Sequence, residues 1–338
     1  MIGKPLLIGL VASCLCVSGA AAGKLDDVKA QGFVQCGVTE GLLGFSKLGA
    51  DNEWAGLDVD YCRALAAAIF DDPKAVRFTP TTTADRFKVL AAGTIDVLAR
   101  TTSWTMERDT QLGVTFVGTL YYDGQGFLVP KASGVTSAVA LSGASVCVEE
   151  ATTSALNAED YFAINKLTYQ PVYFAGHDEA VKAFLDGKCQ AYTTDASGLA
   201  ADRATFANPA DYIILPEVIS KEPLSIAIAQ GDDSWLKVTR WVYFALLDAD
   251  ELGVSQKNVD EMLGSDSPEI KRLLGVGEDD FGASLGLPKD WAYRIIKHVG
   301  NYGDMFDRNV GATTPLALTP GLNALWKDGG IQYAPPIR

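Results

Sequence analysis

Three stretches of the sequence place charged and hydroxyl side chains directly after apolar, strand-like runs. They are LARTTSWTMERD (98–109), EEATTSALNAEDYF (149–162) and AYTTDASG (191–198). The first contains two arginines, the second opens a helix-like segment with two threonines, and the third has an aspartate at the end of its strand. Ligands of α/β proteins often bind beyond the carboxyl ends of strands and at helix starts. The three stretches therefore mark where a small charged ligand would bind.

The first stretch is suited to an anion. Arginine presents a planar fork that holds a carboxylate through two charge-assisted hydrogen bonds. Arg108 stands where the next helix begins, and Thr101 and Ser103 add hydroxyl and backbone donors. A surface ion pair of Arg108 with Glu107 or Asp109 is the alternative.

The other two stretches supply a second anion contact and a cation contact. Thr152 and Thr153 open a helix, where free N–H groups attract an anion, although threonine is also an ordinary helix cap. Asp195 ends a strand and would accept hydrogen bonds from an ammonium group, with a helix cap as the alternative. Anion contacts in two places and one ammonium contact describe a site for an α-amino acid.

The elements that position these stretches alternate along the chain. The predicted strands are residues 33–38, 75–80 and 95–99 in a first series and residues 144–150, 168–176 and 190–195 in a second. Amphipathic helices lie between them, which is typical of α/β folds with mostly parallel sheets. The series are joined by 124–133 and 218–233, two extended stretches that each carry a proline. We therefore predict two lobes connected by a hinge.

The sequence also predicts which part of the chain forms each lobe. We expect lobe one to comprise residues 23–128 and 224–338, and lobe two residues 129–223. Residues 234–338 contain several helix-like segments and few strand signals. They are predicted to form a helical extension on lobe one.

The first 22 residues have the layout of a signal peptide. A basic Lys4 is followed by an apolar stretch from Leu6 to Val17 and then by small residues, so we expect cleavage after Ala22. A membrane anchor is an alternative, but the apolar stretch is shorter than the roughly 18–20 residues of a spanning helix. Lipid attachment at Cys14 is a second alternative.

Four cysteines remain after such cleavage. An even number in an exported protein suggests disulfides, and four cysteines allow three pairings. Cys36 and Cys62 lie in the first series, and Cys147 and Cys189 in the second. We predict one disulfide in each lobe, Cys36–Cys62 and Cys147–Cys189, with four free thiols as the alternative.

Composition argues against several other classes of protein. The formal net charge is −14, and no basic cluster suggests nucleic-acid binding. His177 and His298 are the only histidines and lack partners at metal-ligand spacing, and no G-x-S-x-G elbow is present. We expect neither a metal nor a cofactor.

The chain resembles the solute-binding proteins of polar amino acid ABC uptake systems, in the general L-amino acid and glutamate/glutamine/aspartate/asparagine branch. The resemblance rests on GLDVDYCRALA (56–66), GTIDVLARTTSWTMERD (93–109), VCVEEATTS (146–154) and AYTTDASGL (191–199). The most specific part is DWAYRIIKHVGNYGDMFDRNVG (290–311) followed by GLNALWKDGGIQYAPPIR (321–338). The resemblance implies an α/β periplasmic binding protein of type II, with two lobes that close about a hinge.

The resemblance also implies roles for individual residues. Arg108 would clamp the α-carboxylate together with Ser103 and, from lobe two, Thr153. Asp195 would receive the α-ammonium with help from Thr101. Contacts to the side chain of the ligand are expected from Glu40, Phe45, Thr83, Arg86, Arg100 and Thr152.

The implied function is binding without reaction. A monomer in the periplasm would bind an L-amino acid between its lobes and deliver it to an inner-membrane ABC permease. A periplasmic dehydratase-like enzyme that uses Glu149 or Glu150 as its acid or base is the main alternative. A ligand-sensing partner of a chemoreceptor is another.

Overall fold

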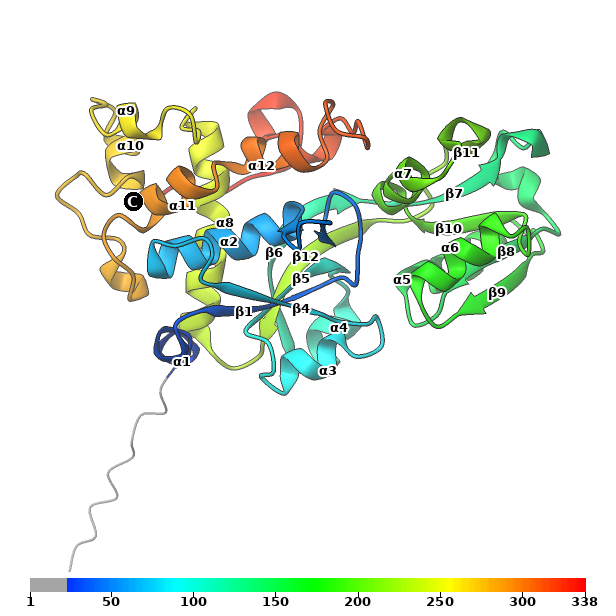
Figure 1. The fold of residues 1–338 in the computed structure, drawn as a ribbon, viewed down its shortest axis with the longest axis horizontal. Helices are drawn as coiled ribbons and strands as arrows, with labels where there is room; N and C mark the ends of the chain where they lie inside the picture. The colour runs from blue at the N-terminus through cyan, green and yellow to red at the C-terminus, as the bar shows by residue number, and fades with distance from the viewer. Residues whose placement is uncertain (1–22) are drawn as a thin grey trace, which may run out of the picture.

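The computed structural model describes residues 23–338, and these form two lobes, each built around a five-stranded sheet (Figure 1). The predicted signal peptide and Cys14 lie outside the described residues. In residues 23–338 no helix is both long and apolar enough to cross a membrane.

The sheet of lobe one has the strand order β4-β1-β5-β12-β6. These strands are β4 (Val76–Pro80), β1 (Val34–Val38), β5 (Val97–Ser103), β12 (Glu222–Ala229) and β6 (Val114–Asp123). β1 pairs in parallel with β4 and β5, whereas β12 runs antiparallel to both β5 and β6. β12 reaches the middle of this sheet only after the chain has passed through lobe two.

The sheet of lobe two has the strand order β11-β7-β10-β8-β9. These strands are β11 (Tyr212–Ile214), β7 (Gln125–Pro130), β10 (Ala191–Asp195), β8 (Ser145–Glu149) and β9 (Gln170–Phe174). The three strands predicted for the second series pair in parallel, and β7 and β11 add antiparallel neighbours. This lobe is covered by α5 (Thr153–Ile164), α6 (His177–Leu185) and α7 (Ala196–Thr205).

The chain crosses between the sheets twice. It leaves the first sheet at Gly124, between β6 and β7, and returns through residues 215–221, between β11 and β12. The predicted lobe boundaries at 128/129 and 223/224 fall inside β7 and β12. The prolines used as landmarks lie within these strands because Pro130 ends β7 and Pro223 is the second residue of β12.

The first two helices of lobe one share a large apolar core with the C-terminal region, whereas the helix at 86–91 packs in a separate apolar cluster with Ile95 and Phe116. The helices before the crossing are α1 (Lys24–Gln31), α2 (Leu57–Phe70), α3 (Arg86–Ala91) and α4 (Met106–Gln111). Those after it are α8 (Asp233–Glu251), α9 (Val259–Met262), α10 (Pro268–Leu273), α11 (Trp291–His298) and α12 (Tyr302–Asn309). Lobe one also carries a short hairpin of β2 (Lys47–Leu48) and β3 (Trp54–Ala55).

The C-terminal extension is bonded to the first sheet as well as packed against it. Tyr302 donates a hydrogen bond to the carbonyl oxygen of Leu120 in β6 at 2.9 Å. Gln332 is fully buried, accepts from Tyr243 and donates to the carbonyl oxygen of Thr119. The predicted helical extension on lobe one is therefore confirmed.

Both predicted disulfides are present. Cys36 in β1 is bonded to Cys62 in α2, and Cys147 in β8 is bonded to Cys189. Cys189 lies just before β10. Each disulfide joins elements of a single lobe, so neither restricts the movement of one lobe relative to the other.

Candidate functional site

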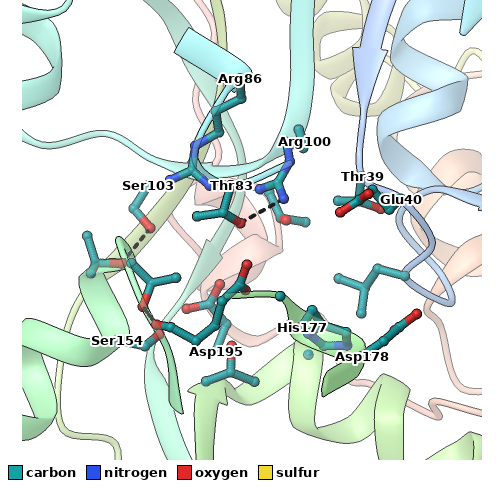
Figure 2. Close-up of a pocket in the computed structure, with 18 of the residues that line it drawn as sticks. Thr39, Glu40, Thr83, Arg86, Arg100, Ser103, Ser154, His177, Asp178 and Asp195 are labelled. Carbon is teal, nitrogen blue, oxygen red and sulfur yellow. Dashed lines mark hydrogen bonds between the residues drawn. The ribbon is translucent and has the colours of Figure 1, made fainter. Parts of the chain in front are cut away.

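A cavity of about 310 Å³ lies between the two lobes (Figure 2). Its walls follow β1, β4 and β5 in lobe one and β8, β9 and β10 in lobe two, so they lie at the carboxyl ends of parallel strands. Ligands of open α/β sheets bind at this end. The predicted site residues that line the cavity are Glu40, Thr83, Arg86, Arg100, Thr101, Ser103, Arg108, Thr152, Thr153 and Asp195.

Phe45 is the predicted contact that the structure does not bring to the cavity. Its side chain is 1% exposed and packs edge-on against Tyr121, with ring centroids 5.4 Å apart. The loop after β1 turns back here, because the backbone N–H of Phe45 donates to the carbonyl oxygen of Leu42 and Gly44 adopts a φ of +83°. Phe45 consequently belongs to the core of lobe one.

Arg108 reaches the cavity from the short helix α4. Thr105 caps this helix by accepting a hydrogen bond from the backbone N–H of Arg108 at 3.3 Å. The guanidinium is buried and donates from Nη1 to the carbonyl oxygen of Ser103 at 2.9 Å. Within residues 23–338 it forms no ion pair with Glu107 or Asp109. The alternative of a surface ion pair with either acid is therefore not realised there, and the remaining N–H donors of Arg108 are available to a ligand.

Arg86 and Arg100 lie beside each other on the same wall (Figure 2). Arg100 donates to the carbonyl oxygen of Thr81 at 3.0 Å and to the hydroxyl of Thr83 at 2.9 Å. Arg86 is 4% exposed, and its Nε has no hydrogen-bond partner in the described part of the chain. Burial, and then the charges of Arg100 and Arg108, hold the pKa of Arg86 well below its usual range. A buried cation without a partner is costly, and an anionic ligand group would offset that cost.

Asp195 faces these arginines from lobe two (Figure 2). It stands directly before α7, yet its side chain forms no cap hydrogen bond with that helix. Oδ1 is buried without a hydrogen-bond partner among residues 23–338. Burial, and then the carboxylates of Asp123 and Glu222, raise the pKa of Asp195 well above its usual range. The helix-cap alternative does not describe this aspartate, whose carboxyl group is left for a ligand.

The threonine pair at the start of α5 is already partly engaged. The hydroxyl of Thr152 accepts from the backbone N–H of Ala155 at 3.1 Å and donates to the carbonyl oxygen of Glu149 at 2.7 Å. Thr152 is thus a helix cap, although it also lines the cavity. The hydroxyl of Thr153 donates to Glu222 at 3.0 Å.

Glu222 is a buried residue at this site that the sequence did not suggest. Its side chain is 1% exposed and accepts hydrogen bonds from Ser103, from Thr153 and from Ser220, the last at 2.9 Å. Asn157 of α5 is a further donor. A glutamate between a lysine and a proline at the start of a strand looks like a surface residue. Its partners lie up to 119 residues away along the chain, beyond the reach of local patterns.

Glu222 changes the roles that Ser103 and Thr153 can have. A hydroxyl has one proton to donate, and both residues direct theirs to this carboxylate in the present structure. Because Ser103 belongs to β5 and Thr153 to α5, Glu222 also joins the two lobes. A ligand carboxylate would therefore rely on Arg108 and on backbone N–H groups at the start of α5.

The backbone at Thr101 is unusual. Thr101 has a φ of 43°, in the left-handed region that non-glycine residues rarely adopt, and its N–H donates to Asp58 at 3.2 Å. Burial raises the pKa of Asp58 to about 7, although the Thr101 hydrogen bond and the charge of Arg100 oppose the shift. Strained residues of this kind cluster at ligand sites.

His177 was also missed as a lining residue. It begins α6, its Nε2 lies 2.9 Å from Asp202, and its Nδ1 lies 3.3 Å from the hydroxyl of Tyr192. Burial lowers the pKa of His177, but the hydrogen bond and charge of Asp202 together with the charges of Glu149 and Asp178 outweigh it, so the pKa is raised. No group of three or more potential metal ligands occurs among residues 23–338. Glu149 lines the cavity, whereas Glu150 does not.

Comparisons with known proteins identify the family. Residues 34–285 match the model of the bacterial extracellular solute-binding proteins, family 3. The chain is 53% identical over 332 residues to the general L-amino acid-binding periplasmic protein AapJ of Rhizobium johnstonii, covering 98% of this chain and 97% of AapJ. It is 48% identical over 337 residues to the glutamate/glutamine/aspartate/asparagine-binding protein BztA of Rhodobacter capsulatus, covering 99% of both chains.

A solved structure agrees with these matches. An ABC transporter periplasmic binding protein from Brucella ovis, with glutathione bound, superposes with a TM-score of 0.92 at 53% identity. The match covers 94% of this chain and 100% of the other. From its sequence, its two-lobe fold and the cavity between the lobes, the chain belongs to the bacterial extracellular solute-binding proteins of family 3.

Proposed function

We propose that this protein is the substrate-binding component of an ABC uptake system and that it binds an L-amino acid between its lobes. The observation that carries the proposal is a pair of opposite, unpartnered charged groups that line one cavity. Within residues 23–338 neither Arg86 Nε nor Asp195 Oδ1 has a hydrogen-bond partner. An amino acid carries both complementary charges. The names of AapJ and BztA, which describe them as amino-acid-binding proteins, support the same conclusion.

The charges assign parts of the ligand to the two walls. Arg108 holds the α-carboxylate from lobe one, and the backbone N–H of Thr153 adds to it from lobe two. Asp195 receives the α-ammonium, with Thr101 as a second contact. Ser103 positions this group of residues through its bond with Glu222.

The rest of the cavity favours a polar or acidic ligand side chain. Arg86 and Arg100 extend the positive wall beyond Arg108 and would pair with a carboxylate or an amide oxygen. Thr83 holds the guanidinium of Arg100 in place, while Glu40 and Thr152 line the remaining surface. Acidic amino acids and their amides fit this wall better than aliphatic ones, because the latter would leave Arg86 unpaired.

Delivery to a permease requires that the ligand-bound protein have a different shape from the ligand-free protein. Only the closed arrangement brings both walls to the ligand, so binding shifts the lobes toward closure about the two crossing segments. We propose that a monomer in the periplasm, released from its signal peptide after Ala22, presents this closed form to an inner-membrane ABC permease. The ligand is released unchanged, and Glu149 contributes to the wall without acting as an acid or base.

A thermal-shift panel tests the proposal. The protein is unfolded and refolded to remove bound ligand and then heated with each of the twenty L-amino acids. A ligand at about a hundred times its Kd stabilises the folded state by roughly 2.7 kcal/mol. Shifts with glutamate, glutamine, aspartate and asparagine are expected to be the largest. Mass spectrometry should recover the bound amino acid unaltered, whereas turnover or a panel without shifts would contradict the proposal.

Glutathione is a second candidate ligand. The Brucella ovis protein, 53% identical to this chain, was solved with it. Glutathione is a γ-glutamyl peptide, so its first residue offers an α-carboxylate and an α-ammonium group, and the rest would need the space beside Arg86 and Arg100. Adding glutathione to the panel distinguishes a site for free amino acids from one that also accepts this peptide.

A further inference from the structure

A second cavity, of about 190 Å³, lies in the C-terminal extension, and none of its lining residues lines the interlobe cavity. It is formed by the end of α8, by α10 and by the chain from Trp326 to Ile337. Figure 1 places the C-terminal end of the chain beside α10. The amino acid site described above does not use this part of the molecule.

The second cavity contains a buried acid without a partner. Asp248, which lines it from α8, is only 8% exposed. Its Oδ2 atom is fully buried and has no hydrogen-bond partner in the described part of the chain. Buried carboxylates are ordinarily paired or hydrogen-bonded, because a buried charge without a partner loses its hydration and gains nothing in return. No basic side chain forms an ion pair with Asp248 in the described part of the chain, although Arg272 lines the same cavity.

The position of Asp248 in its helix adds to this cost. Asp248 and Glu251 lie near the C-terminal end of a 19-residue helix, where the helix dipole favours cations, yet the last turn has no basic residue. Burial, and then the charges of Glu251 and Glu269, raise the pKa of Asp248 to about 7. A cation in the cavity would relieve both effects.

The basic groups nearby are directed elsewhere. Arg272 donates to the carbonyl oxygen of Ile337 at 2.9 Å, and Lys327 donates to the carbonyl oxygen of Glu251 at 2.7 Å. Arg338 lies 3.5 Å from Glu269 at the rim. None of them lies within 4.0 Å of the Asp248 carboxylate in the described structure. Arg338 thus pairs with one of the two glutamates that line the cavity.

The other walls are aromatic and aliphatic. The rings of Trp326 and Tyr333 lie 5.9 Å apart, and both side chains are more than half exposed. Trp326 is held in place by donating from Nε1 to Glu251 at 3.1 Å. The rest of the apolar surface comes from Leu252, Leu273, Ala334, Pro336 and Ile337. Aromatic faces attract organic cations, and the aliphatic side chains would cover a hydrocarbon stem.

We propose that this cavity is a binding site for a primary alkylammonium group, with Asp248 as its counter-ion and Trp326 and Tyr333 packed along its stem. The same chemistry is offered by a free alkylamine and by a lysine side chain on a polypeptide. The site is independent of the amino acid site and would exist even if that proposal failed.

The test follows the indole N–H signal of Trp326 by ¹⁵N–¹H NMR on the mature protein. The sequence has six tryptophans, and Trp326→Phe identifies the signal. Titration with n-butylammonium chloride should move it saturably, whereas sodium chloride at equal ionic strength should not. Asp248→Asn should weaken binding at least tenfold, and Glu269→Gln, a milder change at the rim, several-fold.

Two controls separate this site from other acids of the protein. Asp279→Asn alters an exposed acid outside the cavity, and Asp195→Asn alters the interlobe cavity. Both should leave the titration unchanged. Nα-acetyl-lysine methylamide provides the second arm: binding as tight as that of butylammonium assigns a lysine side chain, and binding of butylammonium alone assigns a free amine. The absence of a saturable shift, or the same affinity in Asp248→Asn, would overturn the proposal.

Discussion

The two walls of the interlobe cavity differ in charge. The lobe-one wall carries three arginines and one carboxylate, Glu40, whereas the lobe-two wall carries one histidine and four carboxylates, Glu149, Asp178, Glu179 and Asp195. Most positive side chains of the cavity thus belong to lobe one, and most negative side chains belong to lobe two. A zwitterionic ligand bound to one wall leaves one of its charges unpaired, which gives the ligand a physical reason to favour the closed form.

Removing the charge of Arg108 from the lobe-one wall should cause the largest loss of ligand affinity. Arg108→Ala would leave the ligand carboxylate poorly paired in a dry cavity, at a cost of about 2–5 kcal/mol, or roughly thirtyfold to several thousandfold in Kd. Isothermal titration calorimetry with the amino acid that gives the largest thermal shift measures the change. Arg77→Ala, on the exposed surface of β4, is the matched control. A loss below tenfold would remove Arg108 from the carboxylate clamp.

Removing the charge of Asp195 from the lobe-two wall should cause the next largest loss of ligand affinity. Asp195→Asn replaces the ammonium receptor with a neutral amide, and we expect a loss of about 1.5–3 kcal/mol, since hydrogen bonds between charged groups lie in this range. The side chain keeps its size, so the fold should tolerate the change. Calorimetry at constant pH gives the affinity.

The raised pKa of Asp195 predicts that ligand binding is accompanied by proton release. Burial, then Asp123 and Glu222, raise its pKa in the ligand-free protein, while Arg108 and Arg86 oppose the shift. An ammonium group stabilises the charged form, so binding should lower this pKa and release protons, and affinity should fall as pH falls. Calorimetry in two buffers with different ionisation enthalpies measures the release. Equal release by wild type and Asp195→Asn would contradict the assignment.

The smallest loss of ligand affinity is expected from a change to Glu222, which connects the two lobes. Glu222→Gln retains one acceptor oxygen for the hydroxyls of Ser103 and Thr153 but removes the charge. We expect a weaker connection between the lobes, a larger radius of gyration for the ligand-free protein, and a loss of about 1 kcal/mol in binding, roughly fivefold. Small-angle X-ray scattering and calorimetry measure the two effects. Glu261→Gln, an exposed residue of α9, should change neither quantity.

Much of the fold could be predicted because it depends on local patterns. The strand predicted at 33–38 contains β1, and an amphipathic helix, α2, follows it as expected before the next strand. Arg108, Thr153 and Asp195 line the cavity, and they could be singled out beforehand because strand ends and helix starts can be recognised in the sequence. Parallel strands then bring their carboxyl ends to one edge without further information.

The remaining features depend on contacts between distant parts of the chain. Phe45 follows a strand at a plausible distance for a ligand contact, but a backward turn at Gly44 directs it into the core. Glu222 and His177 acquire their roles only through partners in other elements, Ser103 and Asp202 among them. The spacing of apolar residues and the amino-acid composition carry no information about such distant partners.

The position of β12 has a consequence for the order of folding. Lobe two is formed by one uninterrupted stretch of chain, whereas the sheet of lobe one lacks the strand between β5 and β6 until residues 222–229 are available. During synthesis or export from the N-terminus, the edges of β5 and β6 that later pair with β12 therefore stay unpaired. The strands of lobe two can already pair with one another at that stage. Lobe two is expected to fold first, and the C-terminal helices then complete lobe one around its returning strand.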